Sequence, residues 1–296
     1  MSKVLFRNNK TIEESYNTKL ILYSDGTIRK REYKRDVYRV ADGWEPLSRK
    51  NTGRITADKQ KTIRRDSLNR TRNMLYEYVK ENLGWKTFVT LTFADPVQDL
   101  TQANKKFHNY IRSVQRKYSQ LRYIGVPEFQ KNGRVHYHIL TNIPAGSDLI
   151  PKRDEPLRLW NPSEKKYTVL DYTDLSYWKH GFSSAYDLEQ ADGNFRPELY
   201  MLKYLYKDLD KRLTGSTKIL KSNNLTKPLE VLYDRNAGPA DPLEDTLRKY
   251  EFERKEIHPQ REFALPFTDV SYKGTEVPST YIEIVSQIPS DVYTKN

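Results

Sequence analysis

The chain has 296 residues, a formal net charge of +12, 12% aromatic residues and no cysteine. Its length and 36% hydrophobic content suit one large or two small folded domains, and the lack of thiols excludes disulfides, cysteine zinc sites and thiol nucleophiles. The N-terminus lacks an apolar signal segment, and no stretch has the roughly 18 apolar residues of a membrane span, so we expect a cytoplasmic protein. The excess of Lys and Arg favours a polyanionic partner such as nucleic acid, although such a charge also serves solubility.

The N-terminal residues 1–65 form a basic region of predicted strands followed by an arm. Within residues 18–40, the sequence SDGT lies between two strand-like runs and predicts a hairpin turn. Residues 49–64 are polar and basic and are typical of a loop. We expect this arm, together with a second basic loop at 211–227, either to contact phosphates or to serve as a solubilising surface.

From residue 66 onward, helical and strand-like patterns alternate. The order between 85 and 213 is a strand, a helix, two strands, a Pro-rich charged insertion at 144–177, a strand and a helix, which predicts an α+β layer fold with an antiparallel sheet. Residues 216–296 are a mixed C-terminal region. The predicted helices cover 66–84, 100–120, 196–213 and 240–256, and the predicted strands lie within 85–96, 121–143, 178–189 and 279–285.

The stretch RVHYHIL at 134–140 places two of the chain's five histidines two residues apart. Successive side chains on a strand alternate between faces, so His136 and His138 share one face and Tyr137 lies on the other. Neutral imidazole is the commonest metal ligand, and two imidazoles need a third group. The preceding strand offers the carboxylate of Glu128.

The turn between these two strands decides whether Glu128 can join the histidines. A two-residue turn at 132–133 would place Phe129 beside His136 and direct Glu128 to the other face. A three-residue loop at 131–133, with its glycine in the left-handed conformation, places Glu128 directly across from His136. We predict the three-residue loop.

The helix predicted over 196–213 carries a second group of functional side chains. At helical spacing, Tyr200, Lys203, Tyr204 and Lys207 fall on one face, and leucines fall on the other. We expect the leucines to dock on the core and the tyrosines and lysines to face a polar cleft; the alternative is an amphipathic helix with a solvated face. A tyrosine oxygen can attack a phosphodiester, and a nearby cation favours the phenolate.

Three motifs in this order resemble those of the HUH (histidine-hydrophobe-histidine) endonucleases. FVTLTF at 88–93 is similar to the first motif, GRVHYHIL at 133–140 to the histidine motif, and YMLKY at 200–204 to the two-tyrosine form of the third. EFQKNG resembles the carboxylate-bearing strand, and WKHGFSSAYDL resembles the strand before the catalytic helix. Over about 66–230, the chain resembles the rolling-circle replication initiators of the phage and plasmid replication-associated protein family, two-tyrosine type.

The resemblance implies an HUH nuclease fold for residues 66–215, with a central antiparallel sheet in an RRM-like arrangement, flanking helices, and N- and C-terminal extensions. It implies a Mg²⁺ or Mn²⁺ ion held by Glu128, His136 and His138. It further implies that Tyr200 cleaves single-stranded DNA to give a 5′-phosphotyrosine and a free 3′-hydroxyl, that Tyr204 makes a second, strand-transferring attack, and that Lys203 assists at the phosphate. The DNA contacts that it implies are Lys207, Arg134, Thr90 and Thr92.

The expected partners are single-stranded DNA, an origin hairpin, and a helicase and a polymerase of a bacterial host, with no membrane partner. A host helicase is expected because no GxxxxGK[ST] phosphate loop follows the nuclease region. Two alternatives remain open. The same fold serves transposases, which usually have one tyrosine, and mobilisation relaxases; a non-catalytic nucleic-acid-binding module would not need the carboxylate, the histidines and the tyrosines together.

Overall fold

The computed structural model describes residues 5–7, 10–40, 70–130, 133–161, 165–191, 195–207, 219–239, 245, 255–256 and 282–284. The chain divides into two compact units. The first comprises residues 1–63, 228–257 and 277–296, and the second comprises residues 64–227 and 258–276. The division into a nuclease domain with two flanking regions stays a prediction. None of the helices within the described ranges combines the length and the apolar character needed to span a membrane.

The first unit is built on a long hairpin. Strands β2 (Lys10–Leu22) and β3 (Ile28–Val40) pair antiparallel, and the turn between them has Gly26 at φ 81°. The backbone N–H of Tyr23 donates to the carbonyl of Thr27 at 2.9 Å, which confirms the predicted SDGT hairpin. The remaining strands of this sheet are β1 (Leu5–Arg7), β11 (Leu229–Tyr233), β12 (Lys255–Glu256) and β13 (Ile282–Ile284).

Strand β12 corrects one sequence prediction and β13 confirms another. The helix expected over 240–256 is wrong at its C-terminal end, because residues 255–256 pair with β13 as a strand. β13 falls within the strand predicted at 279–285. The pairing of β12 with β13 depends on a partner nearly 30 residues away, which local helical periodicity does not register.

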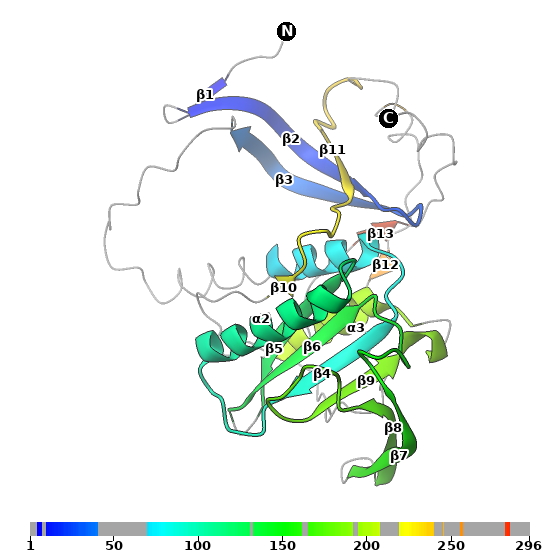
Figure 1. Ribbon diagram of the computed structural model, residues 1–296. Coiled ribbons are helices and arrows are strands. Elements are labelled where there is room, and N and C mark those ends of the chain that lie inside the picture. The colour runs from blue at the N-terminus through cyan, green and yellow to red at the C-terminus, as the bar shows by residue number, and fades with distance from the viewer. Residues whose placement is uncertain are drawn as a thin grey trace. The chain divides into compact units, whose positions relative to one another are not determined.

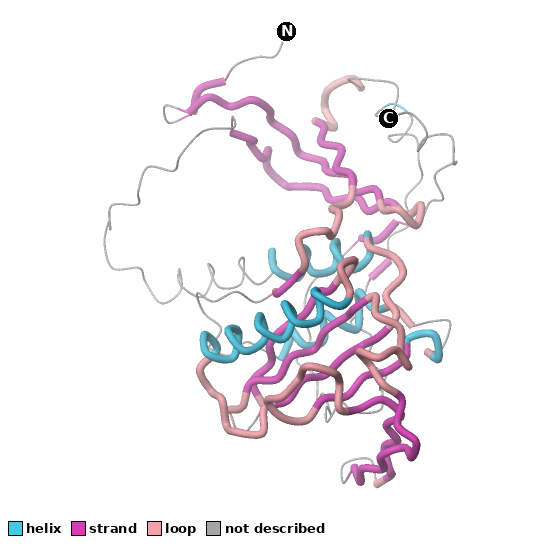
Figure 2. The backbone as a smooth tube through the Cα atoms, viewed as in Figure 1, coloured by secondary structure: helices cyan, strands magenta, loops and turns pink. Residues whose placement is uncertain are grey.

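The second unit has one seven-stranded sheet in the order β10-β5-β6-β4-β9-β8-β7, and every neighbouring pair is antiparallel (Figures 1 and 2). This confirms the mixed α+β class and the antiparallel sheet. The strands are β4 (Thr87–Thr92), β5 (Tyr123–Phe129), β6 (Val135–Thr141), β7 (Lys152–Asn161), β8 (Lys166–Thr173), β9 (Ser183–Asp187) and β10 (Leu220–Lys221). The helices are a first helix over 70–81, α2 (Leu100–Lys117), the short η1 (Leu188–Gln190) and α3 (Pro197–Lys207).

One face of this sheet carries the hydrophobic core against α2. Asp99 caps the helix by accepting the backbone N–H of Thr101 at 2.7 Å, and the helix buries Phe107 and its neighbours at helical spacing. The ring of Tyr137 on β6 stacks on Phe107 with centroids 4.7 Å apart, and its hydroxyl donates to Asn104 at 2.7 Å. Because residues on a strand alternate, the histidines beside Tyr137 lie on the opposite face.

The predicted insertion at 144–177 contains the β7–β8 hairpin, which extends the sheet beyond β9. The connection from this hairpin to β9 bends at Gly181, as predicted, with φ 148°. A Cβ at this position would lie 2.3 Å from the backbone nitrogen of Ala94 and 2.4 Å from the carbonyl oxygen of Thr92. Glycine therefore allows the chain to run tightly along β4.

Candidate active site

The loop between β5 and β6 sets the register of the two strands. Gly133 has φ 83°, and its N–H donates to the carbonyl of Gln130 at 2.8 Å. The N–H of Gln130 in turn donates to the carbonyl of Arg134 at 2.9 Å. Glu128 is paired directly with His136. The predicted three-residue register is confirmed, and it places the carboxylate on the face of the two histidines.

Glu128 and His138 form the closest polar contact of this face. The carboxylate Oε2 lies 2.6 Å from Nε2 of His138, and both side chains are buried. The other ring nitrogen of His138, Nδ1, lies 3.4 Å from the hydroxyl of Thr90 on β4. Nδ1 of His136 lies 3.2 Å from the amide nitrogen of Gln130. These contacts hold both imidazoles in place on the sheet.

Helix α3 covers the same face and brings both predicted tyrosines onto it. Tyr200 and Tyr204 are 0% and 1% exposed, and their hydroxyl oxygens lie 2.8 Å apart. The ring of Tyr204 stacks on the imidazole of His138 with centroids 3.7 Å apart and planes inclined by 20°. Phe88 packs edge-on against Tyr200 at 5.0 Å. The tyrosines therefore join the histidine pair in one buried cluster.

This packing corrects the expectation that the tyrosines face a polar cleft. Leu199, Leu202 and Leu205 on α3 are buried too, so the helix is enclosed on both the leucine and the tyrosine faces. The physical reason is that each tyrosine ring has apolar area to bury and satisfies its hydroxyl locally. Lys203 and Lys207 lie in α3, but their side chains are outside what the structure describes.

The environment of Tyr204 keeps its phenol protonated. Burial raises the pKa of Tyr204 well above its ordinary value of 10, and the adjacent Tyr200 and the carboxylate of Glu128 raise it further. A phenolate at this position needs compensating positive charge, because both burial and the nearby carboxylate disfavour a second anion.

The predicted DNA contacts lie in three different settings. Thr90 is buried against His138, whereas Thr92, which pairs with His136, is half-buried at the end of β4. Arg134 is half-buried where the loop enters β6. Their contacts with DNA stay a prediction.

Sequence analysis missed two contributors to the site, Phe88 and Gln130. Phe88 stands two residues before Thr90, and Gln130 stands two residues after Glu128. The period-two spacing of strand side chains would have placed both on the face of the site.

The donor chemistry of this face fits a small divalent cation. A carboxylate and two imidazoles come from adjacent strands to one face, although no three such groups within the described ranges stand together as a finished metal site. Ligand atoms about 2.1 Å from an ion stand about 3 Å apart at right angles. The 2.6 Å between Glu128 and His138 is close to that spacing. Mg²⁺ prefers oxygen ligands, so the imidazoles favour Mn²⁺ of the two.

Comparison with known proteins places this cluster in a family context. Residues 86–209 match the Replication-associated protein family of the ORF2 type. The matched segment contains Glu128, both histidines and both tyrosines, so the whole described cluster falls inside it. The segment belongs with replication-associated proteins.

A curated relative supports the same context. Over 140 residues, the chain is 28% identical to the "Phasyl DNA replicon protein arp" of Escherichia coli. The similarity covers 46% of this chain and 47% of the relative, so the chain spans about half the length of the protein that it matches. No solved structure matches the chain significantly.

Proposed function

We propose that this protein is a rolling-circle replication initiator of the HUH endonuclease type, a metal-dependent, site-specific single-stranded DNA endonuclease and strand transferase. The observation that carries the proposal is the stacking of Tyr204 on His138, which is itself held by Glu128. This contact joins the candidate nucleophiles to the candidate metal ligands. The match of this segment to replication-associated proteins favours replication over transposition or mobilisation.

In this proposal, Glu128, His136 and His138 hold a Mg²⁺ or Mn²⁺ ion. Such an ion, when bound, acts as a Lewis acid on a phosphoryl oxygen and offsets the negative charge that develops during phosphoryl transfer. The protein's own contribution is orientation. The hydroxyl of Thr90 and the amide of Gln130 fix the two imidazole rings, in the way that outer partners orient metal-binding histidines in general.

The covalent step is assigned to Tyr200. Its oxygen forms a bond to phosphorus, the bond from phosphorus to the 3′ oxygen breaks, the phenolic proton is lost, and the 3′ oxygen leaves as a hydroxyl after taking up a proton. The product is a 5′-phosphotyrosine with a free 3′-hydroxyl for a polymerase. Tyr204 makes the second attack, which transfers or closes the strand, and Lys203 neutralises the phosphate.

The burial of both tyrosines adds one requirement to this mechanism. A scissile phosphate reaches the two hydroxyls only when α3 moves away from the sheet or the tyrosine side chains rotate toward solvent, because the rings are almost completely enclosed. The initiator therefore opens this cluster as it binds DNA. The proposed partners are single-stranded DNA, an origin hairpin, and the helicase and polymerase of a bacterial host, in whose cytoplasm the protein acts.

Covalent capture tests the proposal. The full-length protein is incubated with a pool of labelled single-stranded origin oligonucleotides and Mn²⁺, and SDS-resistant adducts are separated on a gel. We expect an adduct with the wild type and none after chelation with EDTA. The absence of any adduct across a broad pool, with Mn²⁺ present and the fold intact by circular dichroism, would contradict the proposal.

A further inference from the structure

The β7–β8 hairpin presents one unusual face to solvent. Trp160 and Tyr167 are 53% and 61% exposed, and Arg158 and Val169 beside them are exposed as well. On the other face of the same hairpin, Thr168 and Leu170 are buried. A strand with one buried and one solvated face normally carries polar side chains on the solvated one, so large apolar side chains there indicate a binding surface.

The two exposed rings form a pair. Trp160 is directly opposite Tyr167 in the register, and their ring centroids lie 5.1 Å apart with planes inclined by 63°. Arg158 is directly opposite Val169 on the same face. An arginine next to two exposed aromatic rings is the combination that single-stranded nucleic acid uses, since bases stack on the rings and phosphates meet the cation.

Strand alternation places this face on the same side of the sheet as the candidate active site. His138 pairs with Thr90, Thr90 with Ser184, and Ser184 with Thr173, so these four side chains share one face. Along β8, every second residue back from Thr173 returns to that face, and Tyr167 is one of them. A strand bound across the sheet therefore meets the hairpin and the tyrosine cluster on one side.

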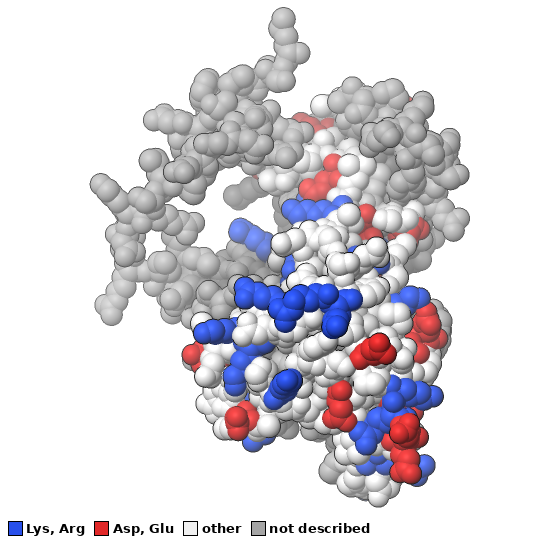
Figure 3. All heavy atoms as spheres, in the orientation of Figure 1, with Lys and Arg blue, Asp and Glu red and all other residues white. Residues whose placement is uncertain are grey.

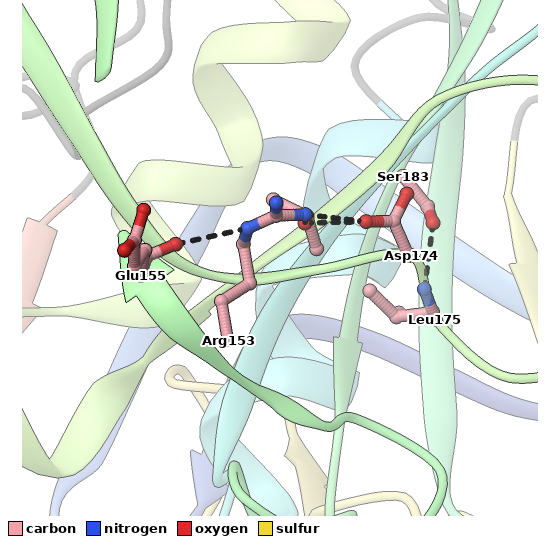
Figure 4. A network of polar contacts seen from close by, with 6 residues as sticks. Arg153, Glu155, Asp174, Leu175 and Ser183 are labelled. Carbon is pink, nitrogen blue, oxygen red and sulfur yellow. Dashed lines mark hydrogen bonds and ion pairs between the residues drawn. The ribbon is translucent and has the colours of Figure 1, made fainter. Parts of the chain in front are cut away.

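Polar contacts fix the base of the hairpin. Nη1 of Arg153 donates to the carboxylate of Asp174 at 2.7 Å and to the hydroxyl of Thr173 at 2.9 Å (Figure 4). The N–H of Leu175 donates to the hydroxyl of Ser183 on β9 at 2.9 Å. The hairpin is thereby tied to the strand next to it, which gives its exposed face a defined orientation on the sheet.

The charges also separate along the hairpin. The described charged residues nearest its tip, within 157–161 and 165–169, are Arg158, Lys165 and Lys166, all basic and exposed. The acidic residues of the hairpin that the structure describes lie nearer its base. Figure 3 shows both signs of charge over this part of the molecule. The basic tip, next to the ring pair, complements a phosphate backbone.

We propose that this face, which we name the stacking face and define as Arg158, Trp160, Lys165, Tyr167 and Val169, binds single-stranded DNA beside the cleavage site. Bases stack on Trp160 and Tyr167, and phosphates contact the basic side chains. The inference rests on the proposed function for its ligand. It assigns to the insertion the role of holding the DNA strand on the sheet.

The test measures binding of fluorescein-labelled oligo(dT) to the full-length protein by fluorescence anisotropy. Stacking is worth about 1–3 kcal/mol per base, so we expect Trp160→Ala and Tyr167→Ala each to weaken binding by about 5- to 150-fold. Trp160→Phe keeps a ring and should bind within a few-fold of the wild type. Leu83→Ala, at a side chain 52% exposed but away from the hairpin, is the matched control and should bind as the wild type does.

A second variant separates stacking from collapse of the hairpin. Arg158→Gln leaves both rings in place, and it should lower the slope of log affinity against log salt by about 0.7, the value for one phosphate contact on single strands. Unchanged affinity in both alanine variants, or an equal loss in Trp160→Phe and Trp160→Ala, would overturn the proposal. So would a wild-type dimer that Trp160→Ala dissociates without a change in DNA affinity, because the face would then bind a second copy.

The covalent capture assay distinguishes the two proposals. If the stacking face binds DNA and the nuclease proposal also holds, Trp160→Ala forms the same adduct at higher oligonucleotide concentrations and reaches the wild-type level at saturation. If only the nuclease proposal fails, no variant forms an adduct, yet Trp160→Ala still loses affinity for oligo(dT). If only the stacking face fails, adduct formation shows the same concentration dependence in the wild type and in Trp160→Ala.

Discussion

Gly181→Ala should destabilise the second unit more than any other glycine-to-alanine change at the described glycines tested below. The added methyl would lie 2.3 Å from the backbone nitrogen of Ala94 and 2.4 Å from the carbonyl oxygen of Thr92. These are backbone atoms of the segment at the end of β4, and they cannot turn aside as a flexible side chain can. The position also has φ 148°, which L-residues rarely adopt.

The magnitude follows from three contributions. A residue held in a sparsely populated backbone region costs about 1–3 kcal/mol, and forcing extra volume into a packed site costs about 1–3 kcal/mol. Relieving the contact would separate the two chain segments. That strains the hydrogen bonds from Ala94 N–H to the carbonyl of His180 and from Thr92 N–H to the carbonyl of Phe182, both 2.8 Å long. Each bond contributes about 0.5–1.5 kcal/mol, so the free energy of unfolding should fall by at least about 3 kcal/mol.

Urea denaturation followed by tryptophan fluorescence measures this loss. Trp178 is a suitable reporter, because its indole N–H donates to the carbonyl of Thr92 at 3.2 Å. Gly146→Ala is the matched control: Gly146 has φ 79° but no atom within 4 Å of the added Cβ, so it isolates the conformational cost of about 1–2 kcal/mol. If Gly181→Ala unfolded within 1 kcal/mol of the wild type, the tight path of the chain along β4 would be wrong.

Three further outcomes are expected. Tyr200→Phe should abolish the first cleavage, whereas Tyr204→Phe should spare it and impair strand transfer, both read by covalent capture; loss of nicking in Tyr204→Phe alone would reverse the assignment. His136→Ala should lose Mn²⁺-dependent cleavage, and full activity of this variant in EDTA would exclude the metal site. Burial raises the pKa of Tyr137, so its phenol stays protonated in the fold while it ionises in the unfolded chain, and stability should fall as pH rises above about 10. Tyr137→Phe should flatten that fall in urea titrations between pH 9 and 11, and an unchanged slope would contradict the cause.

Strand periodicity and turn chemistry explain why part of the site was predictable from sequence. The spacing of His136 and His138 fixes their shared face as soon as the segment is a strand. The glycine at 133 selects the three-residue loop, and that loop fixes the position of Glu128. Both inferences depend on residues fewer than a dozen positions apart, where local geometry determines the outcome.

The burial of the tyrosines was not predictable, because it depends on tertiary packing. Tyr200 and Tyr204 sit on the polar face of an amphipathic pattern, yet that face meets a sheet that offers Phe88 and the ring of His138 as partners. The pairing of β11 with β2 is another example, since it joins segments about 200 residues apart in the chain. No local pattern encodes either contact.

Peptide mapping of the covalent adduct tests the central claim most directly. Trypsin cleaves after Lys203 but not between Arg196 and Pro197, so Tyr200 and Tyr204 fall into different peptides, 180–203 and 204–207. After nuclease trimming of an adduct formed with Mn²⁺, mass spectrometry should find the nucleotide on Tyr200 in the first peptide. A nucleotide on any residue outside α3, or no nucleotide-bearing peptide from an active preparation, would contradict the account.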